Sequence, residues 1–569
     1  MQSYLQYRRI GQAVRAQVAR GDQEKASAPT TLQSSGRSSP LQTAYVAAEP
    51  EQAVEVEKEL APVEPSETVL SEAAAFGHSL EGVHVRQRTD AEGGSGKVFV
   101  VGWESPTDPL NPRNFSFRRK VVTTLIVSLI AFLVGAESSV DSAVAAEAAA
   151  EYGVSDVTES LATGLYLIGY GVGALLSGPF SELFGRNMIY MVTMVVFMIF
   201  VMASALAPNI GAQLAFRFLA GMFGSTPLTC AGGTVADLWS PLEKTYGFPL
   251  YAIPCFAGPM LGPVICSYIG TGHIGSWHWV EWIMLIFTAL TLTIVLLFQP
   301  ETYAPLLLKW KAHHLRTAVG DDRYRADMEI IKTPLLTRMK IALSRPFFLT
   351  IHEPIVMLIS LYMGVVYIVL FTFFDGYTFV FAEVYGTSEG VTNLCFLAMA
   401  MGNFSGVIMV PFVYSKTKKV FEKAAAEGRT EVQPEVRLWY AMLGASFAIP
   451  ISLLWMGWTD YASISIWSPL LASALFGYGI IGIFLSAYMY IIDVYEVYAA
   501  SALTFLTVFR YWLSGGLTVV GIPFYKNMGP HWTCTILACI SMLLTPLPFA
   551  FYKYGHRIRQ FSKFSMNRS

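Results

Sequence analysis

Charged side chains are scarce in this sequence. Asp, Glu, Lys and Arg make up 14% of its 569 residues, whereas soluble globular proteins contain about 25%. A chain with so few charges cannot cover a large surface against water, so the composition excludes an ordinary soluble domain. The net charge of −2 provides no basic face for nucleic acid, and we expect no nucleic-acid partner.

Patterns for metal binding, redox chemistry and catalysis are also missing. The cysteines form no Cys-x-x-Cys pair and lie in or beside apolar runs, which is typical of small buried side chains. There is no GxxxxGK[ST] loop for ATP, no His-Glu-x-x-His pattern and no credible Ser-His-Asp set. We therefore predict no metal site, no disulfide, no cofactor and no enzymatic activity.

The first 95 residues lack the apolar core of a secretory signal. They are rich in Ala, Glu, Gln, Ser and Thr, which predicts a disordered tail over 1–95. Four arginines within residues 4–20 leave open a basic helix near a membrane surface: Arg8, Arg9, Arg15 and Arg20. A short segment, 96–118, would connect this tail to the first apolar run.

What the sequence does contain is a series of apolar runs of about twenty residues, the length that lets a helix cross a hydrocarbon core of about 30 Å. Strands of a membrane barrel would instead alternate over about ten residues. We predict an all-α membrane protein with two six-helix halves, 119–298 and 353–552. The twelve spans are expected near 119–138, 159–180, 188–207, 211–232, 247–270, 279–298, 353–375, 391–412, 438–458, 463–488, 498–522 and 533–552.

Lys and Arg are concentrated on one side of these predicted spans. The central loop, 299–352, and the interval 413–437 are rich in both, whereas only Lys526 lies on the opposite side. Because Lys and Arg stay cytoplasmic, the central loop and both tails, including 553–569, are predicted to face the cytosol. Five intervals on the opposite side contain neither residue: 139–157, 208–210, 271–278, 376–390 and 459–462.

The connection between the second and third predicted spans reads Gly-Pro-Phe-Ser-Glu-Leu-Phe-Gly-Arg-Asn over residues 178–187. It resembles the loop signature of the major facilitator superfamily. In that family the acid and the arginine hold the cytoplasmic helix ends together and help to set the inward–outward equilibrium. The resemblance implies this role for Gly178, Glu182, Gly185 and Arg186, although basic residues of the signature are replaced at 183 and 187.

The fourth predicted span contains Arg217 about two turns from its start. An ionised side chain inside a membrane is costly unless it faces a partner or an aqueous cavity, which favours a functional role over hydrogen bonds to backbone carbonyls. The stretch Gln213–Gly221 resembles the family motif whose arginine is implicated in proton coupling.

The fifth predicted span contains small residues four apart, which let helices approach closely. The stretch resembles the antiporter motif of the family, which is associated with exporters. This implies a conformational role for Gly258, Pro259, Gly262 and Pro263. Cys266 and Ser267 replace the last two glycines of that motif.

Further stretches narrow the resemblance to the fungal twelve-span drug:proton antiporters: 108–116, 218–239, 300–305 and 498–502. The resemblance covers 100–555 and implies a monomer that works by alternating access. Its partners would be protons, the lipid bilayer and a small organic cargo such as a drug, a toxin, another secondary metabolite or a polyamine. The plasma membrane is expected, with the vacuolar membrane as the alternative. A nutrient importer or facilitator and a non-transporting sensor also stay open.

Few ionisable groups lie inside the predicted spans. Glu137 and Asp141 are four apart near the outer end of the first span, which places them on one helical face. A buried carboxylate can bind a proton near neutral pH, so both are candidates for proton coupling, with solvated helix-end acids as the alternative. A substrate cavity is predicted from Asp375, Phe374, Tyr377, Tyr488 and Tyr490, and structural or gating roles are predicted for Asp493 and Arg510.

Overall fold

The computed structural model describes residues 1–27, 80, 82–89, 95–269, 276–330, 335–428, 433–495, 498–562 and 564. The chain forms two compact units. One unit comprises Met1–Gln2, Phe115–Thr302 and Leu335–Ser569, and the other comprises Ser3–Asn114 and Tyr303–Pro334.

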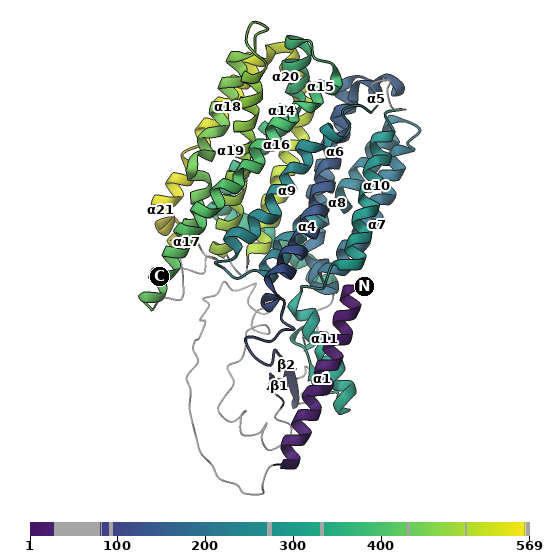
Figure 1. The fold of residues 1–569 in the computed structure, drawn as a ribbon, viewed down its shortest axis with the longest axis vertical. Coiled ribbons are helices and arrows are strands. Elements are labelled where there is room, and N and C mark those ends of the chain that lie inside the picture. Colours follow the sequence, from purple (N-terminus) through teal and green to yellow (C-terminus); the bar gives the residue numbers. More distant parts are fainter. Residues whose placement is uncertain are drawn as a thin grey trace. The chain divides into compact units, whose positions relative to one another are not determined.

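The first unit is a bundle of long helices (Figure 1). Its first half consists of α4 (Phe117–Glu137), η2 (Val140–Ala143), α5 (Ala145–Tyr152), α6 (Asp156–Phe184), α7 (Arg186–Ala205), α8 (Ile210–Leu238), α9 (Lys244–Ile265) and α10 (Trp279–Phe298). Its second half consists of α13 (Leu335–His352), α14 (Pro354–Tyr377), η3 (Thr378–Val384), α15 (Glu389–Leu394), α16 (Phe396–Ser405), η4 (Gly406–Ile408), α17 (Met409–Ala426), η5 (Pro434–Leu438), η6 (Ala441–Ala445), α18 (Ser446–Thr459), α19 (Trp467–Tyr495), α20 (Ala499–Leu544) and α21 (Leu547–Phe561).

Ten helices of the described residues are long and apolar enough to cross a membrane. The last of them, Ala499–Gln560, has 62 residues, about three times the roughly 20 that one span needs, so it is long enough to hold two spans. Gly529 divides them, because its φ of 75° lies outside the helical range and Pro530 follows it. With α8, a helix of 29 residues that packs on α6 and α7, the described chain contains the twelve predicted spans.

Local sequence signals explain where several of these helices begin. Ser155 accepts a hydrogen bond from Thr158 N at the start of α6. Asn209 accepts one from Ala212 N, at 2.9 Å, at the start of α8. Such side-chain caps satisfy amide groups that have no partner inside the helix.

Helix α9 contains four prolines, each of which removes one helical hydrogen bond. Pro263 leaves the carbonyl of Pro259 without its helical donor, and Ser139 Oγ donates to that carbonyl at 2.7 Å. Ser128 Oγ of α4 donates to the carbonyl of Tyr251 at 3.1 Å. Serine hydroxyl groups of α4 and of the segment that follows it therefore stabilise a helix that proline would otherwise weaken.

The second unit contains α1 (Gln2–Ser27), β1 (Val83–Thr89), β2 (Ser95–Val101), η1 (Pro112–Asn114), α11 (Ala304–Val319), β3 (Tyr324–Arg325) and α12 (Asp327–Ile330). Its sheet has the order β1-β2-β3. Strand β2 pairs antiparallel with β1, where Val83 faces Val101, and parallel with β3, where Phe99 faces Tyr324. The predicted central loop, 299–352, thus contributes α11, β3 and α12 to a folded unit.

The prediction of disorder over 1–95 is wrong at both ends of that range, where α1 and β1 are formed. Ile10 and Val14 lie four apart on α1 and are buried in one cluster with Leu307 and Leu315 of α11. The average composition of the tail did not reveal this short apolar face. Residues 28–79, 81 and 90–94 lie outside the described part of the chain.

Candidate functional site

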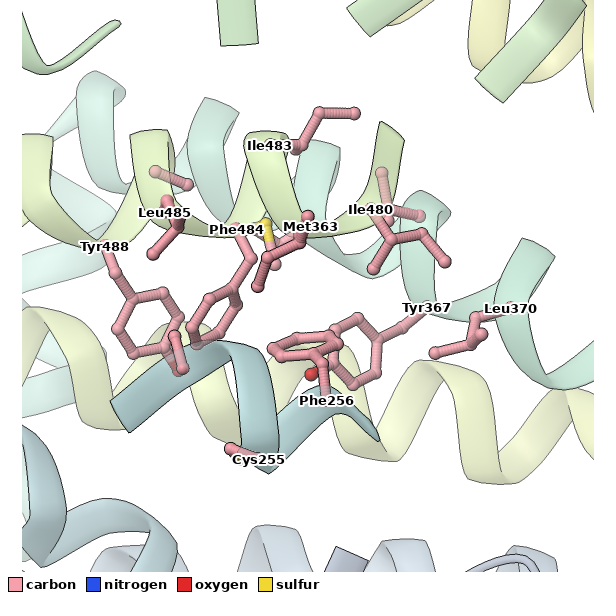
Figure 2. Close-up of a cluster of buried hydrophobic side chains, with 14 of the residues drawn as sticks. Cys255, Phe256, Met363, Tyr367, Leu370, Ile480, Ile483, Phe484, Leu485 and Tyr488 are labelled. Carbon is pink, nitrogen blue, oxygen red and sulfur yellow. The ribbon is translucent and has the colours of Figure 1, made fainter. Parts of the chain in front are cut away.

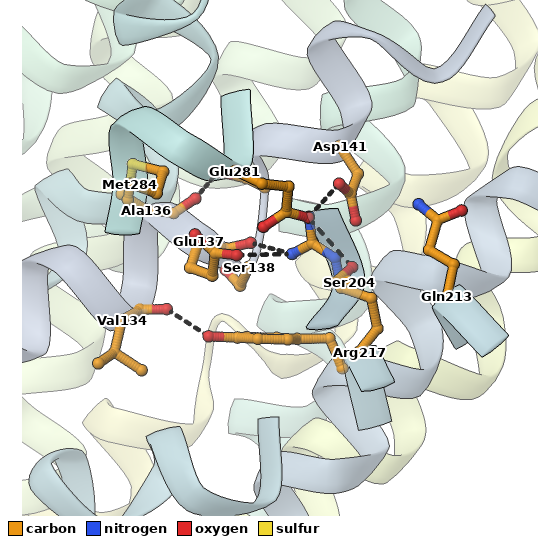
Figure 3. A network of polar contacts seen from close by, with 12 residues as sticks. Val134, Ala136, Glu137, Ser138, Asp141, Ser204, Gln213, Arg217, Glu281 and Met284 are labelled. Carbon is orange, nitrogen blue, oxygen red and sulfur yellow. Dashed lines mark hydrogen bonds and ion pairs between the residues drawn. The ribbon is translucent and has the colours of Figure 1, made fainter. Parts of the chain in front are cut away.

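Arg217 of α8 is buried in the first half, with 1% of its surface exposed, among three carboxylates (Figure 3). Its Nη1 donates to Oε1 of Glu137 and to the carbonyl oxygen of Glu137, both at 3.1 Å. Its Nη2 contacts a carboxylate oxygen of Asp141 and one of Glu281. We call these four residues the Arg217 cluster. They come from α4, η2, α8 and α10.

Glu137 and Asp141 do not share one face of a continuous helix, so that prediction is wrong. Helix α4 ends at Glu137, and Asp141 lies in the tighter helix Val140–Ala143. The amide of Ser138 bonds to the carbonyl of Gly135, three residues earlier, which marks the change of geometry. The break nevertheless directs both carboxylates towards Arg217.

The Arg217 cluster has more negative than positive groups. Three carboxylates surround one guanidinium, so full ionisation would leave two uncompensated negative charges. Glu137 Oε2, Glu281 Oε2 and Arg217 Nε have no hydrogen-bond partner among the described residues. Buried charge of this kind is expensive unless it is neutralised. The arrangement suits a group that exchanges protons.

A further buried acid lies close to this cluster. Glu159, in the first turn of α6, accepts a hydrogen bond from Gln213 Nε2 at 3.1 Å. Gln213 precedes Arg217 by one turn of α8, and Figure 3 shows it beside the cluster. Glu159 is 1% exposed. The first half therefore holds four buried carboxylates near one arginine.

The sequence reasoning missed Glu159 and Glu281. Each lies in the first turn of a long apolar helix, where an acid also fits an ordinary helix start. Glu281 is further obscured by the tryptophans at 279 and 282, which resemble an interfacial aromatic belt. Only the packing of α10 against α4 and α7 reveals that its carboxylate points inward.

A second buried arginine, Arg510 of α20, lies between the two halves. Two cavities meet at it, of about 30 Å³ and about 90 Å³. The smaller is lined by residues of α4, α6, α8, α9, α14, α19 and α20, including Ser138, Cys255 and Tyr511. Figure 2 shows part of its wall, where Phe256 and Tyr367 lie beside Phe484.

The larger cavity extends from Arg510 to the connection between α6 and α7. Its lining includes Thr504 and Thr507 of α20, and Glu182 and Arg186 at the far end. That end is the one that the charge pattern predicts to face the cytosol.

Three tyrosine rings connect the two arginines. The guanidinium of Arg217 lies 5.9 Å from the ring of Tyr166, which is 4.9 Å from the ring of Tyr170. The ring of Tyr170 is 5.0 Å from that of Tyr511, which lies 4.7 Å from the guanidinium of Arg510. Tyr166 and Tyr170 both donate to the carbonyl of Val134, at 2.9 and 2.7 Å, near the end of α4.

Of the predicted cavity residues, Tyr488 lines the larger cavity. The other four are not among the lining residues of either cavity. Tyr377 stacks on Phe396 with ring centres 3.8 Å apart, and Phe374 meets the same ring edge-on at 5.3 Å. Tyr490 packs 5.8 Å from Phe551.

Asp375 faces Gly521 of α20, where an added Cβ would lie 2.0 Å from its Oδ2. That oxygen has no hydrogen-bond partner among the described residues.

The loop signature forms a compact polar contact. Gly185 has a φ of 87°, which the sharp turn between α6 and α7 requires. Arg186 Nη1 donates to Ser181 Oγ at 2.6 Å, and its Nε pairs with Asp237 at 3.3 Å. Glu301 accepts from the amide of Arg186 at 3.0 Å at the start of α7. An added Cβ at Gly178 would meet no described atom within 4 Å, so no steric reason for a glycine is apparent there.

Arg437 of η5, which the sequence reasoning did not select, joins the two halves. It pairs with Asp493 at 2.6 Å, which gives the predicted structural residue Asp493 a partner. Arg437 Nη1 donates to Thr245 Oγ1 at 2.5 Å and Nη2 donates to the carbonyl of Pro241 at 2.7 Å. Both acceptors belong to the connection between α8 and α9 or to the start of α9.

The small residues of α9 allow a very close approach to α4. An added Cβ at Gly258 would lie 2.3 Å from the carbonyl oxygen of Phe132. One at Gly262 would lie 2.6 Å from that of Ala136. Pro259, between them, lines the cavity at Arg510. The motif therefore lies between the Arg217 cluster and the central cavity.

Comparison with known proteins agrees with this architecture. The model of the Major Facilitator Superfamily matches residues 127–519. The MFS-type transporter kojT of Aspergillus flavus is 50% identical over 466 residues, which cover 82% of this chain and 82% of that protein. The MFS-type efflux pump MFS2 of Trichophyton rubrum is 36% identical over 468 residues, which cover 82% of this chain and 77% of that protein.

Among solved structures, the proton:xylose symporter XylE matches with a TM-score of 0.55 and 15% identity, over 77% of this chain and 96% of that one. The human organic anion transporter MFSD10 matches with a TM-score of 0.52 and 15% identity, over 76% of this chain and all of that one. At this identity the two structures support the fold alone.

Proposed function

Because this chain belongs to the major facilitator superfamily, we propose that it is a proton-coupled exporter of small organic molecules that works by alternating access. The observation that carries the proposal is the Arg217 cluster, in which three buried carboxylates share one guanidinium. Family membership supports a transporter rather than an enzyme. The proton coupling and the direction of transport are our inferences from the site.

The charge balance suggests how protons take part. When the cluster faces the outside, protons bind its carboxylates and remove uncompensated charge. When it faces the cytosol, they leave again, and the ionised carboxylates of Glu137, Asp141 and Glu281 then share the single positive charge of Arg217. Because this change occurs in the packed first half, it alters how α4 and α10 contact α8. Such a change can favour either the outward-open or the inward-open arrangement of the two halves.

Export rather than import is supported by the close contact of α9 with α4 at Gly258 and Gly262, the stretch that resembles the antiporter motif. The name of the Trichophyton relative, an efflux pump, agrees with this direction. The Lys and Arg distribution supports an orientation with 299–352, 553–569 and the N-terminal segment in the cytosol. We propose a monomer in the plasma membrane, with residues 119–298 and 353–552 as the moving halves.

Net accumulation of a chemically diverse compound panel in yeast cells that lack their own pumps tests this proposal. The cells would carry an empty vector, the wild-type protein, Arg217→Gln or the control Lys418→Gln, each with and without a protonophore. Lys418 is a suitable control because its side chain is 53% exposed on α17. We expect wild type and Lys418→Gln to lower the accumulation of at least one compound several-fold, and only without the protonophore.

Two outcomes would contradict the proposal. Raised accumulation would indicate import. Lowered accumulation that persists with the protonophore and in Arg217→Gln would exclude proton coupling through the Arg217 cluster. Protein levels measured in the membrane fraction separate these outcomes from poor expression of the variant.

A further inference from the structure

The two buried arginines differ in what surrounds them. Arg217 has three carboxylates of the chain as partners, whereas Arg510 forms an ion pair with no carboxylate of the described residues. Nε and Nη1 of Arg510 also have no hydrogen-bond partner there. Like Arg217, Arg510 has 1% of its surface exposed. A buried cation with free donors is costly, and a proton cannot be removed from arginine to relieve that cost.

Four aromatic rings supply part of the missing stabilisation. The guanidinium of Arg510 lies 4.5 Å from the ring of Tyr367, 4.7 Å from Tyr511, 5.2 Å from Tyr488 and 5.4 Å from Phe484. Ring faces attract a cation but accept no strong hydrogen bond. The rings therefore hold the guanidinium in place and leave its polar edge available.

The two central cavities beside Arg510 lack negative charge near its guanidinium. Arg510 lines both central cavities. The lining of the smaller one contains no acidic residue. In the larger one, the acid among the lining residues is Glu182, at the end beside Arg186. The electrostatic potential at Arg510 thus favours an anion that enters from the cavity.

We propose that Arg510 binds the anionic group of the cargo, and that the cargo is a small planar organic acid in its deprotonated form; this inference rests on the proposed export function. A planar guanidinium forms paired hydrogen bonds with a carboxylate or another delocalised oxyanion. The surrounding rings offer flat faces on which a cargo ring stacks. Cavities of about 30 and 90 Å³ suit one small ring rather than a bulky, flexible compound.

The polar groups near the cage fit the same cargo. Tyr488 OH and Thr507 Oγ1 form a hydrogen bond at 3.0 Å, and both residues line the larger cavity with Arg510. Because one of the two hydroxyl hydrogens is used in that bond, the pair provides one further donor for an oxyanion or a ring hydroxyl group. Ser138, which directly follows Glu137 of the Arg217 cluster, lines the smaller cavity. Cargo and proton sites are therefore joined through the end of α4.

Binding of three probes of equal ring size to the purified full chain in nanodiscs tests the proposal. Benzoate is an anion, benzyl alcohol is neutral and benzylammonium is a cation, and titration calorimetry would measure the dissociation constant of each. We expect benzoate to bind at least roughly tenfold more tightly than the other two, because only benzoate forms charge-assisted hydrogen bonds with Arg510. Arg510→Met should remove this preference.

Lys526→Met is the matched control, because it removes a cation from the same helix at an exposed position, 54% accessible, away from the cage. It should keep the preference for benzoate. Equal binding of the three probes to the wild-type protein would overturn the proposal even if Arg510→Met did not fold. Unchanged benzoate binding by a folded Arg510→Met would also overturn it.

The outcome is separable from that of the proposed function. Proton-driven export of neutral or cationic compounds, with no preference for benzoate, would leave the exporter intact and reject the role of Arg510. A clear preference for benzoate without proton-driven transport would support the role of Arg510 and reject the proposed exporter.

Discussion

Glu281 is the acid of the Arg217 cluster that comes from α10 and also accepts a hydrogen bond from Ser204 Oγ of α7, at 3.3 Å. Glu137 and Asp141 reach Arg217 from the end of α4 and from η2. Glu281 therefore ties two further helices to the Arg217 cluster. The carboxylates of Glu281 and Asp141 both pair with Nη2 of Arg217.

We predict that Glu281→Gln lowers proton-driven export by at least about tenfold, which corresponds to about 1.4 kcal/mol. Glutamine keeps the size of the side chain but cannot exchange a proton, so the cluster has one fewer titratable group. The decrease would be measured as the protonophore-sensitive part of cargo accumulation. Glu422→Gln, at a position 63% exposed on α17, is the control. Normal export by Glu281→Gln would assign this residue a purely structural role.

At the scale of helices, the contact between α4 and α9 depends on the absence of side chains. The carbonyl oxygen of Phe132 occupies the place that a Cβ at Gly258 would need, with 2.3 Å between them. Backbone atoms cannot move aside as a flexible side chain does. Small residues at such positions let membrane helices pack closely.

Gly258→Ala is expected to separate α4 from α9 and to reduce both stability and transport. Overpacking of this kind costs about 1–3 kcal/mol, which should appear as a lower thermal unfolding temperature of the detergent-purified protein. Gly516→Ala is the matched control, because an added Cβ there meets no described atom within 4 Å. If both variants unfold at the wild-type temperature, the close approach of α4 and α9 does not contribute to stability.

At the scale of the whole transporter unit, Arg437 forms contacts that join the halves beside the α8–α9 connection. It bonds to Thr245 and to the carbonyl of Pro241 in the first half while it pairs with Asp493 in the second. Alternating access requires such contacts to break and re-form in each cycle.

Arg437→Met should weaken this closure. Cys230 lines the larger central cavity and serves as a reporter in a chain whose other cysteines are replaced by alanine. We expect a water-soluble maleimide to label it several-fold faster in Arg437→Met, because a lost set of buried hydrogen bonds is worth about 1–3 kcal/mol. Lys423→Met, 78% exposed, is the control. An unchanged labelling rate would show that other contacts close this end.

The sequence predicted the spans well because the bilayer sets the length of each apolar run. It failed for α1, whose stability depends on α11, a partner about three hundred residues away: His314 contacts the carbonyl of Tyr7 across 307 positions. No local pattern contains such a partner. The helix therefore resembled the polar tail around it.

The candidate sites were predicted in part for the same reason. Arg217, Glu137 and Asp141 were visible as charges inside apolar runs, and the structure brings them together. Glu281 and Arg437 were not selected, because their importance arises from helices that meet only in the folded chain. Phe374 and Tyr377 were selected by residue type, yet their contacts lie within the second half.

Arg510 and its lack of a partner anion also determine how the proposed cycle responds to membrane voltage. Release of an anion to the outside is electrically equivalent to inward movement of one positive charge. Uptake of a proton moves another positive charge in the same direction. A potential that is negative inside then contributes about 2.3 kcal/mol per charge for every 100 mV, in addition to the pH gradient. Such an exporter keeps a driving force in a neutral medium, where a proton exchanger of uncharged cargo receives less.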